Sequence, residues 1–422
     1  MANEQRHSAC LPVTPSTLFG SACCPQFVIQ HSSFVTPNYL RPMLIQYGID
    51  VLLLQAAAYR SQRLALVTND AALTVDGKPS RAALLQAGFN IVRLFAPEHG
   101  LTRTGDDGAA QPNGTDALTG LPIVSLYGNQ LAPQTADLSD IDAVLFDMPD
   151  IGCRFYTYLW TMTHVMEACA AHGKPLLILD RPNPTGAQLH MAEGPWLNEA
   201  VCSSFIGRWN IPLRHCCTLG ELARYFAATR LPQLQLIVVP VSGYERRHDA
   251  LLNFPFVPTS PAMQTVQAAL LYPGTGLWEG LNLNEGRGTA APFALCGAPW
   301  LNNQALAEQW QLPGLQVLPH DYTAAAGPYT GEHCHGLLLQ VTDADAFYPV
   351  RSGLALLQAI AQAHPDQLTE RPYPTAANPS GLGHLDRLLG QPGSFAHLLS
   401  GEDFVTDIAA EWEGMMGEYL LY

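Results

Sequence analysis

The sequence predicts an α/β protein in which a parallel sheet covered by helices is followed by a smaller α+β domain. At 422 residues the chain exceeds what one ordinary core accommodates, so two domains are expected. Between Arg63 and Val241, short apolar runs alternate with helical patterns, as in parallel sheets whose strands are buried on both faces. Past Tyr244 this alternation weakens. We therefore place an N-terminal extension at 1–42, the sheet domain at 43–245 and the smaller domain at 246–422.

Six apolar runs of the first half have the length and composition of buried strands. They are Leu64–Val67, Asn90–Phe95, Pro122–Leu126, Ile141–Phe146, Pro175–Leu179 and Leu236–Val239. In open parallel sheets, ligands bind outside the carboxyl ends of the strands. Four of the first five runs end in charged residues beside Gly or Pro, as in Pro97-Glu98-His99-Gly100. We expect the functional site at these ends.

Helical patterns separate the strands. Ser80 is expected to cap a helix through Gln86, which Gly88 ends. Apolar residues spaced i, i+3, i+4 and i+7 predict the clearest helix over Phe155–Cys169, ended by Gly173. A further helix is predicted at Leu219–Thr229. In the smaller domain we expect a strand at Leu337–Val341 and a helix at Leu354–Ala363.

The charge balance narrows the class of partner. The chain has 21 Lys and Arg residues and 36 Asp and Glu residues, which gives a formal net charge of −15. This negative charge argues against binding to nucleic acids and to anionic membranes. No stretch reaches the roughly 18 to 20 apolar residues of a membrane span. The N-terminus lacks a basic start followed by a long apolar run, so we expect no signal peptide and a cytoplasmic protein, with an exported protein as the alternative if the true start is a different residue. An anionic small molecule would need local arginine to bind.

The spacing of the cysteine and histidine residues does not predict a metal-binding site. The ten cysteines include no CxxC pair and do not resemble a disulfide framework. The run His333-Cys334-His335 is metal-like, but neighbouring side chains of an extended segment point to opposite faces. We therefore predict neither a metal site nor a cofactor.

Three segments are dense in groups that could carry chemistry. In the first, Glu98 could act as a general acid if burial raises its pKa, or could simply cap neighbouring backbone. In the second, Asp150 could cap the following helix, and Arg154 could bind an anion or pair with a nearby Asp. The third, Trp278–Thr289, has glycines that would let a ligand approach, but it lacks the phosphate-loop pattern and could be a turn-rich connector.

Together the segments resemble a known family. The chain contains, in order, the blocks GIDVLL, LVTND, LFAPEHGL, TGLPIVSLYG, FDMPDIGCRFYTY, LDRPNPTG, EGP, TLGELA, LLYPGTGLWEG and NEGRGTAAPF…GAPW. These blocks make it similar to the bacterial exo-β-N-acetylmuramidases of the NamZ/YbbC type, from about Gly48 to the final Tyr-Leu-Leu-Tyr. The chain departs from the family at Pro149, where Gln is usual, and in Ser260-Pro-Ala-Met-Gln, where Ser-Pro-Asn-Met-Pro is usual. The export signal that many members carry is not found.

The resemblance implies a Rossmann-like N-terminal domain, a smaller C-terminal domain and an active cleft between them. It implies a role in cell wall recycling, in which N-acetylmuramic acid is removed from the non-reducing end of peptidoglycan fragments. The glutamate of the PEHG block, Glu98, becomes the best candidate for the catalytic acid. Because glycoside hydrolysis also needs a group that stabilises the oxocarbenium-like centre, Asp150 and Glu279 are further catalytic candidates. His99 is a catalytic candidate because it could tune or orient the adjacent Glu98.

The substrate would be a small muramyl saccharide, whose lactyl carboxylate calls for an arginine clamp. Arg154 is the first choice for this clamp and Arg287 the second. The full set of candidate substrate-binding residues is Asn69, Tyr127, Asp147, Arg154, Tyr156, Arg181, Asn183, Trp278, Asn282, Glu285 and Arg287. Two alternatives remain open: a metal-dependent hydrolase using His99, Asp147, Asp150 and His320, and a non-catalytic sugar- or nucleotide-binding protein on the same fold.

Overall fold

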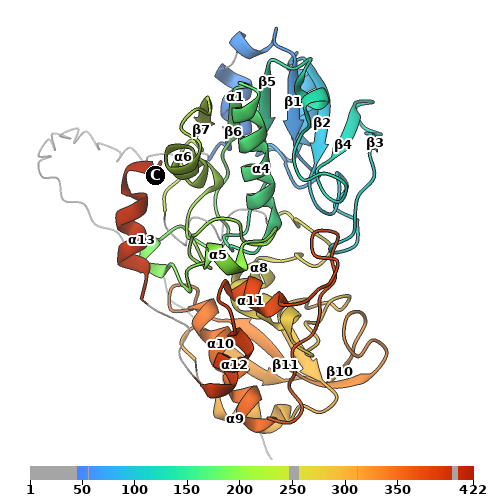
Figure 1. Ribbon diagram of the computed structural model, residues 1–422, viewed down its shortest axis with the longest axis vertical. Coiled ribbons are helices and arrows are strands. Elements are labelled where there is room, and N and C mark those ends of the chain that lie inside the picture. Colours follow the sequence, from blue (N-terminus) through green and yellow to red (C-terminus); the bar gives the residue numbers. More distant parts are fainter. Residues whose placement is uncertain (1–44, 56, 247–255, 311, 402–406) are drawn as a thin grey trace, which may run out of the picture. The chain divides into compact units, whose positions relative to one another are not determined.

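Six short strands form a parallel sheet in the first half of the chain (Figure 1). The computed structural model describes residues 45–422 except 56, 247–255, 311 and 402–406, so the predicted extension at 1–42 lies outside the described residues. The parallel strands are β1 (Leu64–Val67), β2 (Ile91–Ala96), β4 (Pro122–Ser125), β5 (Ala143–Phe146), β6 (Leu176–Leu179) and β7 (Leu236–Val239). The short β3 (Gly114–Thr115), which was not predicted, pairs antiparallel with β4.

The order of the strands is that of a Rossmann-type sheet. The sheet runs β3-β4-β2-β1-β5-β6-β7, so its parallel strands stand third, second, first, fourth, fifth and sixth in chain order. Leu66 of β1 pairs with Leu94 of β2 on one side and Leu145 of β5 on the other. The predicted α/β class with a parallel sheet is confirmed.

Alternate side chains of the strands enter two separate cores. Ala65 and Val67 pack with helices α4 (Thr157–Ala171) and α6 (Leu219–Arg230) on one face. Leu64 and Leu66 pack with α1 (Gly48–Gln55) and α2 (Ser80–Gln86) on the other. This double covering explains why the strands are apolar throughout rather than alternating with polar residues.

The first turns of α6 and α2 are stabilised differently. Helix α6 begins with a side-chain cap, whereas the serine at the start of α2 makes a tertiary contact. At α6, the Thr218 hydroxyl accepts from the Glu221 amide at 3.3 Å, and the Glu221 carboxylate accepts from the Thr218 amide at 3.0 Å, which is a capping box. The predicted capping role of Ser80 is wrong. Ser80 is the first residue of α2, and its hydroxyl accepts from Arg181 at 3.3 Å instead of from the helix backbone.

The second half of the chain contains a four-stranded antiparallel sheet. Its strands are β8 (Leu295–Ala298), β9 (Leu315–Pro319), β10 (Tyr322–Thr323) and β11 (His333–Val341), with β11 pairing to each of the other three. The predicted strand Leu337–Val341 is the end of β11. The predicted helix Leu354–Ala363 lies within α10 (Pro349–Ala363).

Short helices complete the described chain. They are α3 (Thr135–Leu138), α5 (Glu199–Cys202), α8 (Val266–Thr275), α9 (Asn303–Gln309), α11 (His384–Leu389), α12 (Ser394–Ser400) and α13 (Ala409–Met416), with 3₁₀ turns at Ala57–Tyr59, Leu189–Met191, Gly276–Gly280 and Gly417–Tyr419. In the described part of the chain, no helix has both the length and the apolar character needed to cross a bilayer.

The two halves share one hydrophobic core. Trp160 of α4, Leu357 of α10 and Trp412 of α13 belong to the same buried cluster. The end of the chain returns to the parallel sheet, where the Tyr422 hydroxyl donates to Asp180 at 2.8 Å. Because the halves are packed together in one compact unit, residues far apart in sequence can line a common cavity.

Candidate active site

A cavity of about 760 Å³, open mouth included, lies at the carboxyl ends of β2, β4 and β5. The loops after β2 and β4 contribute Glu98, His99 and Tyr127 to its lining, and the start of α4, which follows β5, contributes Thr157. The second half of the chain closes the cavity with Ser260, Glu279, Arg287, Tyr373, His384 and Arg387. This pocket lies at the carboxyl ends of the strands, where the sequence predicts the functional site.

Glu98 lines this cavity and is buried, with 5% of its surface exposed. Its Oε1 accepts from the Gly108 amide at 3.0 Å and its Oε2 from the Thr157 hydroxyl at 2.7 Å. Burial raises the pKa of Glu98. The positive charge available on His99 and the two hydrogen bonds oppose this rise, and the neighbouring Asp107 carboxylate adds to it. Glu98 is therefore suited to hold a proton at higher pH than an exposed glutamate.

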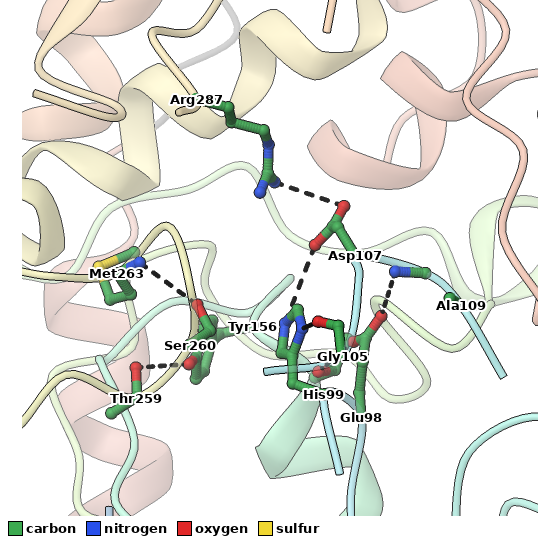
Figure 2. Close-up of polar contacts among 12 residues, drawn as sticks. Glu98, His99, Gly105, Asp107, Ala109, Tyr156, Thr259, Ser260, Met263 and Arg287 are labelled. Carbon is green, nitrogen blue, oxygen red and sulfur yellow. Dashed lines mark hydrogen bonds and ion pairs between the residues drawn. The ribbon is translucent and has the colours of Figure 1, made fainter. Parts of the chain in front are cut away.

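A tight turn after β2 orients His99. His99 has φ of 65° and Gly100 has φ of 73°, so two successive residues occupy the left-handed region, which is uncommon for a residue with a side chain. The His99 Nδ1 donates to the Gly105 carbonyl at 2.9 Å, because a carbonyl can only accept. This leaves Nε2 facing Asp107 at 3.9 Å (Figure 2).

Asp107 is held as a carboxylate by three surrounding groups. Arg287 lies 3.4 Å from its Oδ2, His99 faces its Oδ1, and the Tyr373 hydroxyl donates to it. Burial alone would raise the pKa of Asp107, but Arg287, His99 and the Tyr373 hydrogen bond together lower it below its usual range. The pocket thus contains two carboxyl groups with pKa values shifted in opposite directions, a pattern that identifies acid and base roles.

Arg287 is surrounded by negative charge. Besides Asp107, it bonds Glu279 through Nη2 and Glu285 through Nε, the latter at 3.0 Å. Glu279 also lies 3.9 Å from the His384 Nε2. Because three carboxylates share this guanidinium, its charge is already neutralised within the protein.

Arg387 also lines the pocket, and its guanidinium differs from that of Arg287 in its surroundings within the described part of the chain. Helix α11 presents His384 and Arg387 three residues apart, on the same face, and His384 stacks on Tyr373 with ring centroids 4.6 Å apart. Among the described residues, no hydrogen-bond or ion-pair partner of the Arg387 guanidinium is found. A bound anion would therefore meet an unpaired guanidinium here.

Arg154 does not contact this cavity. It is fully buried, and its Nη1 donates to the carbonyls of Pro195 and Ile211 at 2.7 and 3.0 Å. Its Nη2 donates to the carbonyls of Leu388 and Leu389 at 3.2 and 2.7 Å. The structure corrects the predicted substrate clamp, because these four backbone acceptors already occupy both terminal nitrogens of the guanidinium.

Several other predicted residues lie outside the pocket. Arg181 binds Asp147 in a buried ion pair, with Nε 2.6 Å from Oδ1. Asp150 lies 3.4 Å from the His215 Nε2 and lines a second cavity, of about 990 Å³, together with Arg181. Asp150, a predicted catalytic residue, is therefore not among the residues that line the cavity with Glu98, because the strand ends of the sheet open into two different cavities.

The asparagines predicted to bind substrate make hydrogen bonds within the protein, and the predicted tryptophan is buried. Asn69 donates to the Tyr158 hydroxyl at 3.0 Å, and Asn183 donates to the Cys217 carbonyl at 3.1 Å. Asn282 bridges the Gln367 carbonyl and the Thr369 amide at 2.8 Å each. Trp278 is completely buried. The predicted residues that do line the pocket are Glu98, His99, Tyr127, Tyr156, Glu279 and Arg287, with Glu285 behind Arg287.

The structure does not assemble the metal set considered from the sequence. Asp147 and Asp150 are engaged elsewhere, and His320 is exposed at the end of β9. A different group, Glu98, His99 and Asp107, has one potential donor atom each within 4.8 Å of the others. These three could hold an ion by donor type, although both Glu98 oxygens already accept hydrogen bonds.

Sequence reasoning missed Asp107, Thr157, Tyr373, His384 and Arg387. Thr157 lies inside a segment that was singled out, next to Tyr156. Asp107 does not directly follow a strand, and the other three come from a part of the chain without periodic pattern. Only the Asp-Gly pair at Asp107-Gly108 offered a local signal, that of a turn.

Comparison with known proteins matches both halves of the chain to one family. Residues 64–267 match the N-terminal domain, and residues 270–421 the C-terminal domain, of the family described as exo-β-N-acetylmuramidase NamZ. The chain is 39% identical over 328 residues to the peptidoglycan β-N-acetylmuramidase NamZ of Bacillus subtilis strain 168, covering 76% of this chain and 78% of the relative.

Two crystal structures of DUF1343 family proteins from Bacteroides fragilis NCTC 9343 have the same fold. They have TM-scores of 0.79 and 0.68 and sequence identities of 27% and 26%, and each comparison covers 90% of this chain and 99% of the other. With both halves matched and the pocket formed between them, the chain belongs to the exo-β-N-acetylmuramidase NamZ family.

Proposed function

We propose that this protein is an exo-β-N-acetylmuramidase, a glycosidase that removes N-acetylmuramic acid from the non-reducing end of peptidoglycan fragments. Its family and the name of its Bacillus subtilis relative support this activity. The observation that carries the proposal is the pairing of Glu98, whose pKa is raised, with Asp107, whose pKa is lowered, in one cavity. Glycoside hydrolysis needs one protonated and one ionised carboxyl group of this kind.

In the proposed reaction, Glu98 donates its proton to the glycosidic oxygen as the bond to the leaving sugar breaks. The positive charge that develops on the muramyl ring is stabilised by the Asp107 carboxylate, whose donor oxygen lies within 4.8 Å of that of Glu98. A water molecule then adds to the anomeric carbon, and the proton that this water loses returns to the Glu98 carboxylate. Arg287, His99 and Tyr373 keep Asp107 ionised and fix its orientation. Glu279 acts as a positioning residue, since it bonds Arg287 and approaches His384.

Recognition of the lactyl carboxylate is assigned in this proposal to Arg387. The second sequence candidate, Arg287, already has three carboxylate partners, so a fourth anion would gain little there. Arg387 lines the same cavity and has no partner among the described residues. A charged hydrogen bond to a carboxylate contributes about 1.5–3 kcal/mol, enough to select muramides over glucosaminides.

Turnover of a synthetic disaccharide tests the proposal. Purified protein is expected to release N-acetylmuramic acid from a disaccharide that carries it at the non-reducing end, and to leave the reverse disaccharide intact. The activity should be insensitive to EDTA. Tight binding without turnover would favour a non-catalytic sugar-binding protein. Loss of activity on chelation, restored by zinc, would instead assign Glu98, His99 and Asp107 to a catalytic metal.

A further inference from the structure

A second cluster of chemically active side chains lies on the hairpin of the antiparallel sheet. Strands β10 and β11 pair so that Thr323 is opposite His333 and Tyr322 is opposite Cys334. His333 and His335 are two residues apart and share one face of β11, while Cys334 is buried on the other. Asp321 directly precedes β10, so the hairpin brings its carboxylate beside the two imidazoles.

The donor atoms of these three residues have the spacing of metal ligands. The Asp321 Oδ1 lies 3.2 Å from the His335 Nδ1, and its Oδ2 lies 3.6 Å from the His333 Nε2. One donor atom from each residue lies within 4.8 Å of the other two. A tetrahedral ion with bonds of about 2.0–2.1 Å keeps its ligand atoms roughly 3.3 Å apart, so small side-chain rotations would seat an ion here.

The residues and the solvent around Asp321, His333 and His335 are also suited to a bound ion. Asn303, buried on α9, donates to the Asp321 Oδ1 at 2.7 Å and to the Gly336 carbonyl at 3.0 Å, which fixes the carboxylate from behind. Such outer contacts are typical of metal ligands. The side chains of His333, His335 and Asp321 are 61%, 43% and 47% exposed, so water can complete the coordination.

We propose that Asp321, His333 and His335 bind one divalent transition-metal ion, with Zn²⁺ as the cation best matched to two imidazoles and a carboxylate. None of the three residues lines the proposed active-site cavity, so the site is separate from glycoside hydrolysis. Two features of the chain create it: the i, i+2 spacing of the histidines and the hairpin pairing that adds Asp321.

Titration of chelator-treated protein with ZnCl₂, followed by a competing zinc dye, tests this site. Wild-type protein is expected to bind about one Zn²⁺. The His333→Gln/His335→Gln double variant should bind it at least about tenfold more weakly, and Asn303→Ala should weaken it by roughly 10-fold through the outer contact. Glu98→Gln is the matched control, because it removes a ligand of the other three-donor group and should leave the affinity unchanged.

The double variant should keep the wild-type melting temperature in EDTA and the wild-type turnover in EDTA, since its residues are exposed and outside the pocket. Equal zinc affinity in wild type and double variant would overturn the proposal. So would loss of zinc binding in Glu98→Gln alone, which would place the ion in the active-site cavity.

Discussion

Thr157, the first residue of α4, donates its hydroxyl to Oε2 of Glu98 at 2.7 Å across a separation of 59 residues. The Gly108 amide donates to the other oxygen at 3.0 Å. Each carboxyl oxygen of Glu98 therefore accepts one hydrogen bond from the protein. The remaining lone pairs of these oxygens are available for the catalytic proton. The geometry fixes the orientation of the acid before substrate binds.

Replacing Glu98 by Gln should lower turnover of the natural disaccharide by about 10² to 10⁴-fold, because the shape is kept and the proton donor is lost. With a 4-nitrophenyl muramide, whose leaving group needs little protonation, the loss should be much smaller. The Thr157 hydroxyl can rotate to accept from the new amide, so the melting temperature should change little. Near-wild-type turnover on the disaccharide would exclude Glu98 as the acid.

The pH profile of kcat/KM should have two limbs. Glu98 acts in its protonated form, so the rate falls as pH rises through its pKa, and burial moves this limb above the ordinary glutamate range, near 4.3. Asp107 acts ionised, so the rate falls as pH drops through its lowered pKa.

Tyr373→Phe separates the two limbs. It removes a hydrogen bond that lowers the Asp107 pKa, while the ring can still stack on His384. The acid limb should therefore move to higher pH and the alkaline limb should stay. A profile in which only the alkaline limb moves would contradict the assignment of Asp107.

Arg387→Gln should raise KM for muramides by about tenfold or more, which corresponds to the loss of one charged hydrogen bond. Hydrolysis of the matching N-acetylglucosaminide, which lacks the lactyl carboxylate, should be nearly unchanged. Arg387→Lys is the control, because it keeps the charge and should recover part of the selectivity. Equal losses on both sugars would show that Arg387 supports the pocket rather than the carboxylate.

Arg154→Met should act on stability and not on selectivity. The change leaves the carbonyls of Pro195, Ile211, Leu388 and Leu389 without this donor. Each buried unpaired group costs about 1–3 kcal/mol, so a loss of at least about 3 kcal/mol in the free energy of unfolding is expected. Thermal or urea unfolding measures it. An unchanged stability together with lost preference for muramides would restore Arg154 as the substrate clamp.

The parallel sheet, the main helices that cover it and the position of Glu98 at a strand end all follow from local sequence patterns. Strands β1 and β7 begin and end where the apolar runs predict, and α4 buries the apolar residues that share its helical spacing. These features follow from local periodicity, because burial on both faces requires continuous apolar runs and burial on one side of a helix requires 3.6-residue spacing. Parallel strands share a carboxyl edge, so a glutamate just past β2 was bound to lie at that edge.

Which polar residues share the cavity depends instead on long-range packing. Tyr373 and Arg387 reach the cavity of Glu98 through packing between segments hundreds of residues apart, and Asp107 reaches it through the folding of the irregular loop after β2, so no periodic pattern encodes either placement. The same applies to Arg154 and Arg387. Both are arginines near the start or in the middle of a helix, yet Arg154 donates to backbone carbonyls, whereas Arg387 lines the pocket with no partner among the residues that the structure describes. The N–H groups of a guanidinium can donate to a carbonyl, a carboxylate or a bound ligand. The fold determines which of these acceptors lies within reach, because it sets the neighbours of the side chain.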